Sequence, residues 1–171
     1  MPPLESFDRN DTMDFRSVFL VIGILLTILA VMMGIPAIFD LLDGHPDWEV
    51  FTVSAGVTLF VGVAMALTSR AGSMRLSTRQ AFMMTTFSWI ALTVFAALPF
   101  HFGALGLSFT DAYFEAMSGL TTTGSTVIVG LDAAPSGILV WRALLQWLGG
   151  IGIIVMAIAI LPMLNVGGMQ L

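Results

Sequence analysis

Four long apolar stretches separated by short polar segments predict a helical membrane protein. Each stretch is close to the about 20 residues of helix that cross the ~30 Å hydrocarbon core of a bilayer. The stretch from Val18 to Ile35 contains no charged residue. The expected spans run over residues 16–39, 50–67, 80–100 and 137–164. The fold class is therefore predicted to be all-α and integral to a membrane, with four transmembrane helices.

Prolines and small residues add detail to these spans. Because proline lacks an N–H group and crowds the preceding turn, Pro36 is expected to kink or end the first span. Pro99 is expected to end the third span. In the second span, Gly56, Gly62 and Ala66 are expected to let a neighbouring helix approach closely.

A fifth apolar run, over residues 109–120, is too short to cross a bilayer. About 12 residues of helix reach only ~18 Å, so we expect a re-entrant half-helix that stops partway across. A hydroxyl-rich segment bracketed by glycines follows it, with the sequence GLTTTGST over residues 119–126. Backbone without regular structure is tolerated at membrane depth only where protein buries it or where it lines a water-filled path. This segment is therefore the candidate ion filter.

Three features of the segment favour a cation over an anion. Threonine prefers extended backbone, which sets carbonyl oxygens along a path, and such carbonyls replace the water shell of an ion in selectivity filters. Gly124 can adopt the positive φ that other residues resist. The half-helix points its C-terminal end, which carries partial negative charge, toward the membrane interior. The alternative is a re-entrant loop that only packs against its neighbours.

Charged residues surround this half-helix and the start of the fourth span. Ser108 and Asp111 begin the half-helix, where Asp111 is expected to act in the cap. Glu115 lies one turn further on the same face and is either a structural hydrogen-bonding partner or part of a cation-attracting mouth. Arg142 is expected to pair with Asp111, Glu115 or Asp132, and the sequence does not choose among them.

Composition supports a membrane protein and argues against several other classes. Of 171 residues, 57% are hydrophobic and 10% are charged, whereas soluble domains carry roughly 25% charged residues. The net charge of −5 offers no case for nucleic-acid binding, and the lack of cysteine removes disulfides and thiolate metal sites. His45 is a lone histidine in a turn and is interpreted as solvated, and His101 as an interfacial residue. No nucleophile–base or metalloprotease motif supports an intramembrane enzyme, so the protein is predicted not to be an enzyme.

Arginines outside the spans predict the orientation in the membrane. Positively charged loops face the cytoplasm, so Arg9, Arg16 and the three arginines of the second loop indicate cytoplasmic segments. The acidic first loop is expected to face outward, and both termini are expected to be cytoplasmic. The predicted units are an arm (1–15), a leading two-helix unit (16–68), a loop (69–79) and a helix–pore loop–helix repeat (80–171) with its filter at 121–126.

Two long blocks of this sequence resemble the Trk-type potassium-uptake family. They are DAYFEAMSGLTTTGST at 111–126 and WRALLQWLGGIGIIV at 141–155. The tail ILPMLNVGGMQL at 160–171 and the loop GHPDW at 44–48 are similar to that family as well. The resemblance covers nearly all of the chain after the N-terminal arm.

The resemblance implies an architecture, a location and partners. A leading helix pair would precede four helix–pore loop–helix repeats around one pseudo-fourfold pore, in the bacterial cytoplasmic membrane. The complete protein would form a homodimer and would be regulated by a cytosolic ring of nucleotide-binding subunits. Potassium would be the transported ligand, with no covalent cofactor.

The resemblance also implies which residues bind the ion. Carbonyls of Thr122 and Thr123, flanked by Thr121, Gly124 and Ser125, would hold potassium. Because the filter has one glycine per repeat, selectivity over sodium is expected to be looser than in channels with two filter glycines.

The chain departs from the family pattern because it holds only one repeat. One filter quarter cannot enclose an ion, since its open side would face lipid. We expect a fragment of a longer transporter. The alternatives are separate copies that assemble a pore and a non-conducting accessory subunit. The sequence does not decide between channel-like passage and coupling to protons or sodium.

Overall fold

A computed structural model describes residues 15–69 and 78–160 of the chain. The expected arm, most of the 69–79 loop and the chain after residue 160 lie outside the described residues. Within the described ranges the regular secondary structure is entirely helical. In chain order the elements are α1 (Phe15–Met32), α2 (Gly34–Leu42), α3 (Asp47–Thr68), α4 (Thr78–Ala96), α5 (Leu98–Phe102), α6 (Phe109–Leu120), the 3₁₀ turn η1 (Leu131–Ala133) and α7 (Ser136–Ile160).

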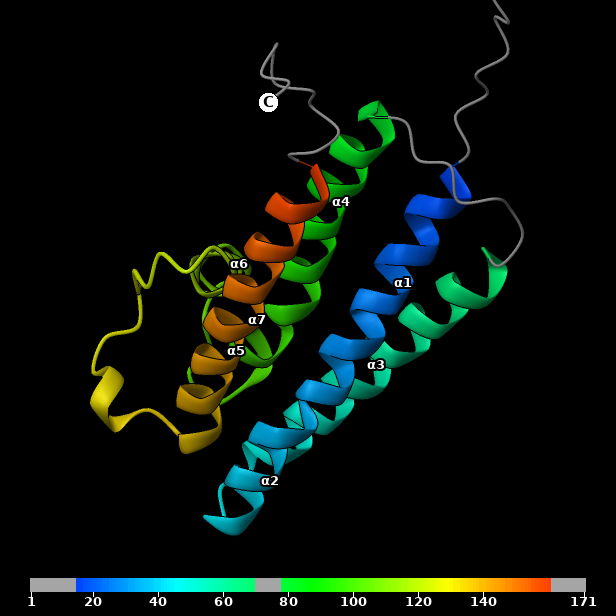
Figure 1. The fold of residues 1–171 in the computed structure, drawn as a ribbon. Coiled ribbons are helices and arrows are strands. Elements are labelled where there is room, and N and C mark those ends of the chain that lie inside the picture. The colour runs from blue at the N-terminus through cyan, green and yellow to red at the C-terminus, as the bar shows by residue number, and fades with distance from the viewer. Residues whose placement is uncertain (1–14, 70–77, 161–171) are drawn as a thin grey trace, which may run out of the picture.

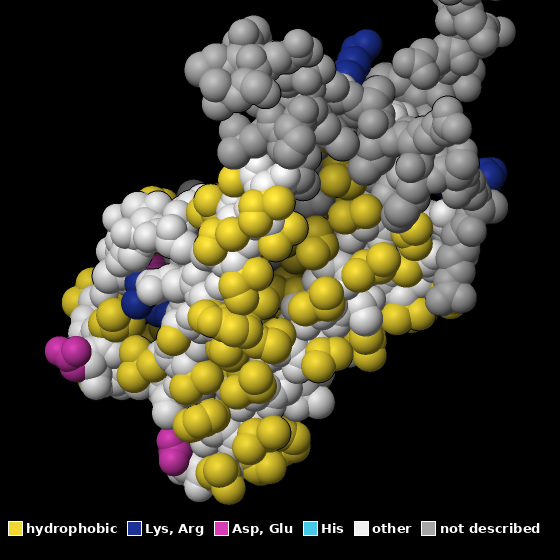
Figure 2. All heavy atoms as spheres, viewed as in Figure 1, with side chains coloured by type: hydrophobic (Ala, Val, Ile, Leu, Met, Phe, Trp, Pro, Cys, Tyr) yellow, Lys and Arg dark blue, Asp and Glu magenta, His cyan; other side chains and the backbone are white. Residues whose placement is uncertain are grey.

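Four helical stretches are long and apolar enough to cross a membrane, which confirms the predicted number of spans. They are Phe15–Leu42, Asp47–Thr68, Arg79–Phe102 and Ser136–Ile158. Hydrophobic side chains cover much of the visible face of these helices (Figure 2). Val31 and Ile158 are among the exposed hydrophobic residues of the chain, each 68% exposed. Such surfaces suit contact with lipid or with further transmembrane helices.

Both prolines interrupt their spans without ending them. α1 gives way to α2 at Met33, three residues before Pro36, and the main-chain N–H of Met33 still donates to Leu29 at 3.1 Å. Pro36 therefore kinks the first span and does not end it. The expectation that Pro99 ends the third span is wrong, because α5 continues it to Phe102. Pro99 lies in the first turn of α5, where its missing N–H has no intrahelical partner to lose.

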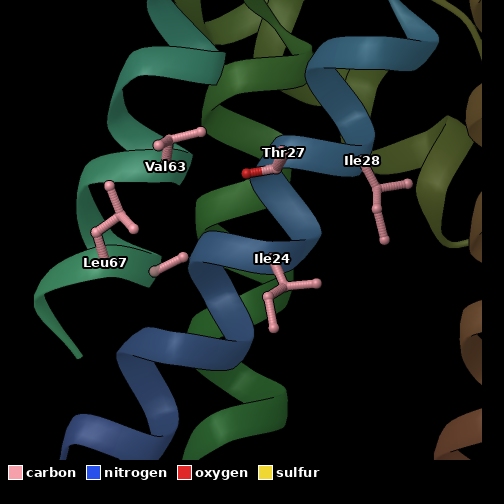
Figure 3. Close-up of a pocket in the computed structure, with 6 residues that line it drawn as sticks. Ile24, Thr27, Ile28, Val63 and Leu67 are labelled. Atoms are coloured by element: carbon pink, nitrogen blue, oxygen red, sulfur yellow. The ribbon is translucent and has the colours of Figure 1, made fainter. Parts of the chain in front are cut away.

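Small residues bring α1 and α3 into close contact. A Cβ atom built on Gly23 would lie 2.7 Å from the carbonyl oxygen of Gly62, so only glycine fits at this crossing. Gly62 therefore does what the sequence predicted, but Gly56 faces open space among the described residues. Beside the crossing, α1 and α3 flank a shallow apolar groove (Figure 3), lined by Ile24, Thr27, Ile28, Val63, Ala66 and Leu67.

Trp141 of α7 contacts both the third span, at Ala96, and the leading helix pair, at Phe51. This side chain is completely buried, and its indole N–H donates to the carbonyl of Ala96 at the break between α4 and α5, at 3.0 Å. Its ring also meets Phe51 of α3 edge to face, with centroids 6.2 Å apart. The leading helix pair and the repeat consequently share one core.

Candidate ion-filter segment

The short helix α6 crosses the long helices at a steep angle. In Figure 1 it is seen nearly end-on, beside the middle of α7, whereas the long helices run across the picture. Its start is capped: the main-chain N–H of Asp111 donates to the Ser108 hydroxyl at 3.1 Å, and that hydroxyl donates to the Asp111 carboxylate at 2.7 Å. Ser108 is thus the N-cap, and both bonds use its hydroxyl, which holds the Asp111 carboxylate in the first turn of α6.

Glycines allow the end of α6 to rest directly on α7. A Cβ atom at Gly149 would overlap the carbonyl group of Leu120, the last residue of α6. A Cβ atom at Gly119 would lie 3.0 Å from that of Leu145. Since α7 spans Ser136–Ile160, Gly149 marks its midpoint, and the polar segment begins beside the middle of a membrane-length helix.

The turn after α6 reverses the chain through a Schellman motif. The N–H of Thr123 donates to the carbonyl of Ser118 at 3.0 Å, and the N–H of Thr122 donates to Gly119 at 2.9 Å. These two hydrogen bonds end a helix when the first residue after the C-cap takes the left-handed conformation. That residue is usually glycine. The position is occupied here by Thr122, with φ of 57°.

The backbone of the segment differs from the sequence prediction at two threonines. Thr121, the C-cap of α6, has φ of −80° and ψ of 3°, which is not extended. Threonine was expected to be extended, but the Schellman turn forces Thr122 into a region that β-branched residues avoid. Gly124 has φ of 76°, which lies in the positive range that the sequence analysis noted glycine can adopt. Strained residues of this kind cluster at functional sites, where the surrounding structure holds them.

The carbonyls of residues 121–124 accept no hydrogen bond from any described residue. Residues 121–127 are all exposed in this chain. The hydroxyls of Thr121 and Thr123 lie 2.9 Å apart and bond to each other. The carbonyl of Ser125, in contrast, is occupied by the hydroxyl of Ser118 at 2.6 Å. Residues 121–124 therefore present four main-chain oxygens that accept no hydrogen bond from the described residues, whereas the next carbonyl, that of Ser125, is bonded to Ser118.

Glu115 binds the outgoing limb of the segment, residues 126–127, through hydrogen bonds. One carboxylate oxygen accepts the Thr126 hydroxyl and the Val127 main-chain N–H, both at 2.5 Å. The other accepts Nε of Arg142 at 2.9 Å. The Glu115 side chain is completely buried, and that of Arg142 is 12% exposed.

These contacts settle two questions that the sequence left open. Arg142 pairs with Glu115 rather than with Asp111 or Asp132. Glu115 is a structural partner and not an exposed mouth, because its carboxylate is buried and neutralised by the guanidinium. The negative character that remains near the segment comes from carbonyl dipoles and from the C-terminal end of α6.

Two residues in this arrangement escaped the sequence analysis. Ser118 and Thr126 carry hydrogen bonds that shape the segment. A signal for Ser118 existed, since it is a polar residue in the last turn of an apolar half-helix. Thr126 gave no separate signal, because it is the last of several hydroxyl residues and only the fold shows which of them faces Glu115.

Replacing Thr122 with glycine is expected to stabilise the turn. The left-handed conformation costs a side chain about 1–2 kcal/mol, while glycine loses roughly 0.5–1 kcal/mol through backbone entropy. We expect a net gain of about 0.5–1 kcal/mol in the free energy of unfolding, measured in detergent. The control Ser125→Gly, at a position without positive φ, is expected to lower stability, and an equal effect of both would contradict the assignment of strain.

The helices and the segment define a class: a multi-pass helical membrane protein with a short helix that delivers free carbonyls beside the middle of a span. The profile of the TrkH family, described as a cation transport protein, matches residues 49–171. That match covers most of the chain, and the chain belongs to the TrkH family. The family is one of transport proteins and not of enzymes, as the sequence predicted.

Known relatives agree with this family. The chain is 45% identical over 160 residues to the Trk system potassium uptake protein TrkH of Halomonas elongata, covering 93% of this chain and 33% of that protein. Identity to TrkH of Escherichia coli K12 is 42%, with the same coverage. The crystal structure of the potassium transporter TrkH from Vibrio parahaemolyticus superimposes with a TM-score of 0.85 at 43% identity, covering 92% of this chain and 34% of that one. The chain thus spans about a third of the length of the curated relatives it matches.

Proposed function

We propose that this chain contributes one quarter of a potassium filter to a Trk-type uptake system. The observation that carries the proposal is the row of free carbonyls at residues 121–124, which follows the negative end of α6. Thr122 and Thr123 are the proposed ion-binding residues, flanked by Thr121, Gly124 and Ser125. The ion exchanges its water shell for main-chain oxygens, so no bond is made or broken and no resident cofactor is involved.

The location of the segment supports this role. α6 has 12 residues, too few to cross a bilayer, and it ends against Gly149 in the middle of α7. An exposed polar backbone at that depth requires either protein cover or a water-filled path. We propose that α6 is a re-entrant half-helix and that further repeats close around residues 121–127.

The missing cover points to a longer protein. The relatives are about three times as long as this chain, and their names describe potassium uptake. We propose that the chain is the leading helix pair and first repeat of such a transporter. The complete protein is proposed to form a homodimer that works with a cytosolic nucleotide-binding ring.

The distribution of charge supports an orientation in the bacterial cytoplasmic membrane. Arg16 at the start of α1 and Arg79 at the start of α4 lie at the same end of the bundle (Figure 1), and the acidic turn between α2 and α3 lies at the opposite end. Positive residues favour the cytoplasmic side. We therefore propose a cytoplasmic N-terminus and a filter segment that is entered from outside.

Gly124 provides the most direct test of the filter. Gly124→Ala in the full-length protein is expected to weaken discrimination between potassium and sodium by several-fold. The reason is that an L side chain resists φ of 76°, while the nearest neighbour, the Gln146 amide nitrogen, is 3.9 Å from the new Cβ, so the effect is on backbone rather than packing. The measurement is the ratio of potassium to sodium uptake in proteoliposomes.

A matched control separates strain from selectivity. Gly130 also has a positive φ, 71°, with open space around it among the described residues, but it lies in the outer loop. Gly130→Ala should cost similar stability and leave the ion ratio unchanged. Unchanged flux ratios in Gly124→Ala would contradict the filter assignment and favour a loop that only packs.

A further inference from the structure

Three ligand-type side chains gather at the end of the bundle where α2 turns into α3. Asp40 comes from α2, His45 from the turn, and Asp47 from the first residue of α3. One ligand atom from each lies within 4.8 Å of the other two. None of the three contacts residues 121–127, so the cluster is separate from the filter segment.

The two carboxylates are buried and incompletely satisfied. Asp40 is completely buried, and its Oδ1 accepts the main-chain N–H of Gly137 at 2.7 Å. Its Oδ2 is also buried and has no hydrogen-bond donor in the part of the chain that the structure describes. Asp47 is 4% exposed, and both of its oxygens share one donor, the N–H of Ala104, at 3.0 and 2.9 Å.

The charges around the cluster are unbalanced. The chain contains no lysine, and the charged side chains that act on Asp40 are His45 and Asp47. Two buried carboxylates this close repel each other, and burying a carboxylate without a counter-charge is unfavourable. A bound cation would offset that cost.

His45 presents a lone pair to the cluster. Its Nδ1 accepts the main-chain N–H of Asp47 at 3.3 Å and lies 3.9 Å from the Asp47 carboxylate. A metal ion would bind Nδ1 through the same lone pair and would take the place of this long contact. The side chain is 33% exposed, so it offers a route from solvent and has room to move.

We propose that a divalent transition-metal ion such as Zn²⁺ binds between Asp40, His45 and Asp47. Imidazole combined with carboxylates suits Zn²⁺, whereas Mg²⁺ and Ca²⁺ prefer oxygen ligands alone. Ligand atoms of a tetrahedral zinc site lie roughly 3.4 Å apart, so the three side chains must draw closer together when the ion binds. Water completes the coordination. The sequence alone favoured a solvated histidine, and the packing of α2 against α7 changes that interpretation.

Such an ion would stabilise the contacts of the leading helix pair with the two segments on either side of the pore loop. Asp40 binds the first turn of α7 at Gly137, and Asp47 binds Ala104 in the segment that leads into α6. Binding should therefore stabilise the folded protein, since an ion that binds only the folded state shifts the unfolding equilibrium. The inference stands apart from the proposed potassium filter, and either can fail without the other.

The test is a zinc chloride titration of the chelator-treated full-length protein in detergent, followed by calorimetry and by thermal unfolding. The wild type is expected to show a saturable site and a raised unfolding temperature. His45→Gln and Asp47→Asn should weaken that site by at least about tenfold, because even residues behind the ligands change metal affinity 10–100-fold. Glu49→Gln, which removes an exposed negative charge from the first turn of α3, is the matched control and should bind within about twofold of wild type.

Three outcomes would overturn the proposal. The first is no zinc binding by the wild type, and the second is equal binding by wild type and His45→Gln. The third is calcium binding as tight as zinc binding, which would leave the imidazole without a role. His45→Gln keeps a polar side chain at a partly exposed position, so its unfolding temperature without zinc shows whether the fold is retained.

Discussion

Replacing Glu115 with alanine is expected to abolish potassium uptake by the full-length protein. The carboxylate joins Arg142 of α7 to the Thr126 hydroxyl and the Val127 main chain, all at 2.9 Å or less. Removing it leaves a nearly buried guanidinium without its partner and frees the outgoing limb of the segment. Breaking a buried ion pair in this way costs about 3–5 kcal/mol. Uptake in a potassium-dependent strain and the unfolding temperature in detergent are the measurements.

Asp111→Ala is the matched control for this carboxylate. Asp111 lies on the same helix, one turn earlier, but its partner is the Ser108 hydroxyl at the helix start. Loss of that contact should cost no more than about 1 kcal/mol and should preserve uptake. Normal uptake in Glu115→Ala would show that the limb keeps its shape without the buried pair.

Replacing Gly149 with alanine is expected to have the second largest effect. The new methyl group would overlap the carbonyl of Leu120, so α7 and the end of α6 would have to separate. Overpacking of this kind costs about 1–3 kcal/mol in ordinary cores. The displaced carbonyl of Leu120 lies in the turn that positions the filter segment. Misplacement by ~1 Å can lower activity at least tenfold at a functional site, so uptake should fall by at least about tenfold.

Gly152→Ala tests whether the effect is specific. Gly152 lies on the same helix with open space around it among the described residues. Alanine is favoured over glycine in a helix by about 1 kcal/mol, so this variant should be as stable as wild type or slightly more stable. Equal losses of uptake in both variants would indicate that α7 tolerates no added methyl group, and would remove the argument for a contact at Leu120.

The variants Thr122→Gly and Gly124→Ala test different properties of the segment, strain in the first case and ion selectivity in the second. The first concerns a conformation that only the structure revealed. The second concerns a position that the sequence already singled out. Together with Glu115 they separate the oxygens that face the proposed ion from the side chains that hold those oxygens in place.

Features that depend on local sequence were predicted well. Apolar runs of about 20 residues indicate spans wherever they occur, and the apolar run over residues 109–120 forms the separate helix α6, whose re-entrant position stays a prediction. Gly124 was singled out because glycine can take a positive φ without steric cost, and its φ is 76° in the structure. The error at Pro99 has a local cause as well, because proline ends a helix in most positions but starts one easily.

Features that depend on contacts between distant segments were decided by the tertiary structure. Arg142 had three possible partners by sequence, and only the packing of α6 on α7 brings Glu115 to it. Thr122 is left-handed because the Schellman turn that ends α6 requires a positive φ at this position, which overrides the preference of threonine for extended backbone. Asp40 is buried against Gly137, 97 residues away, a contact that no periodicity encodes. Hydrophobic length acts on each segment alone, whereas the pairing of polar groups is set by how helices meet, and so the sequence determined the spans while the fold determined the site.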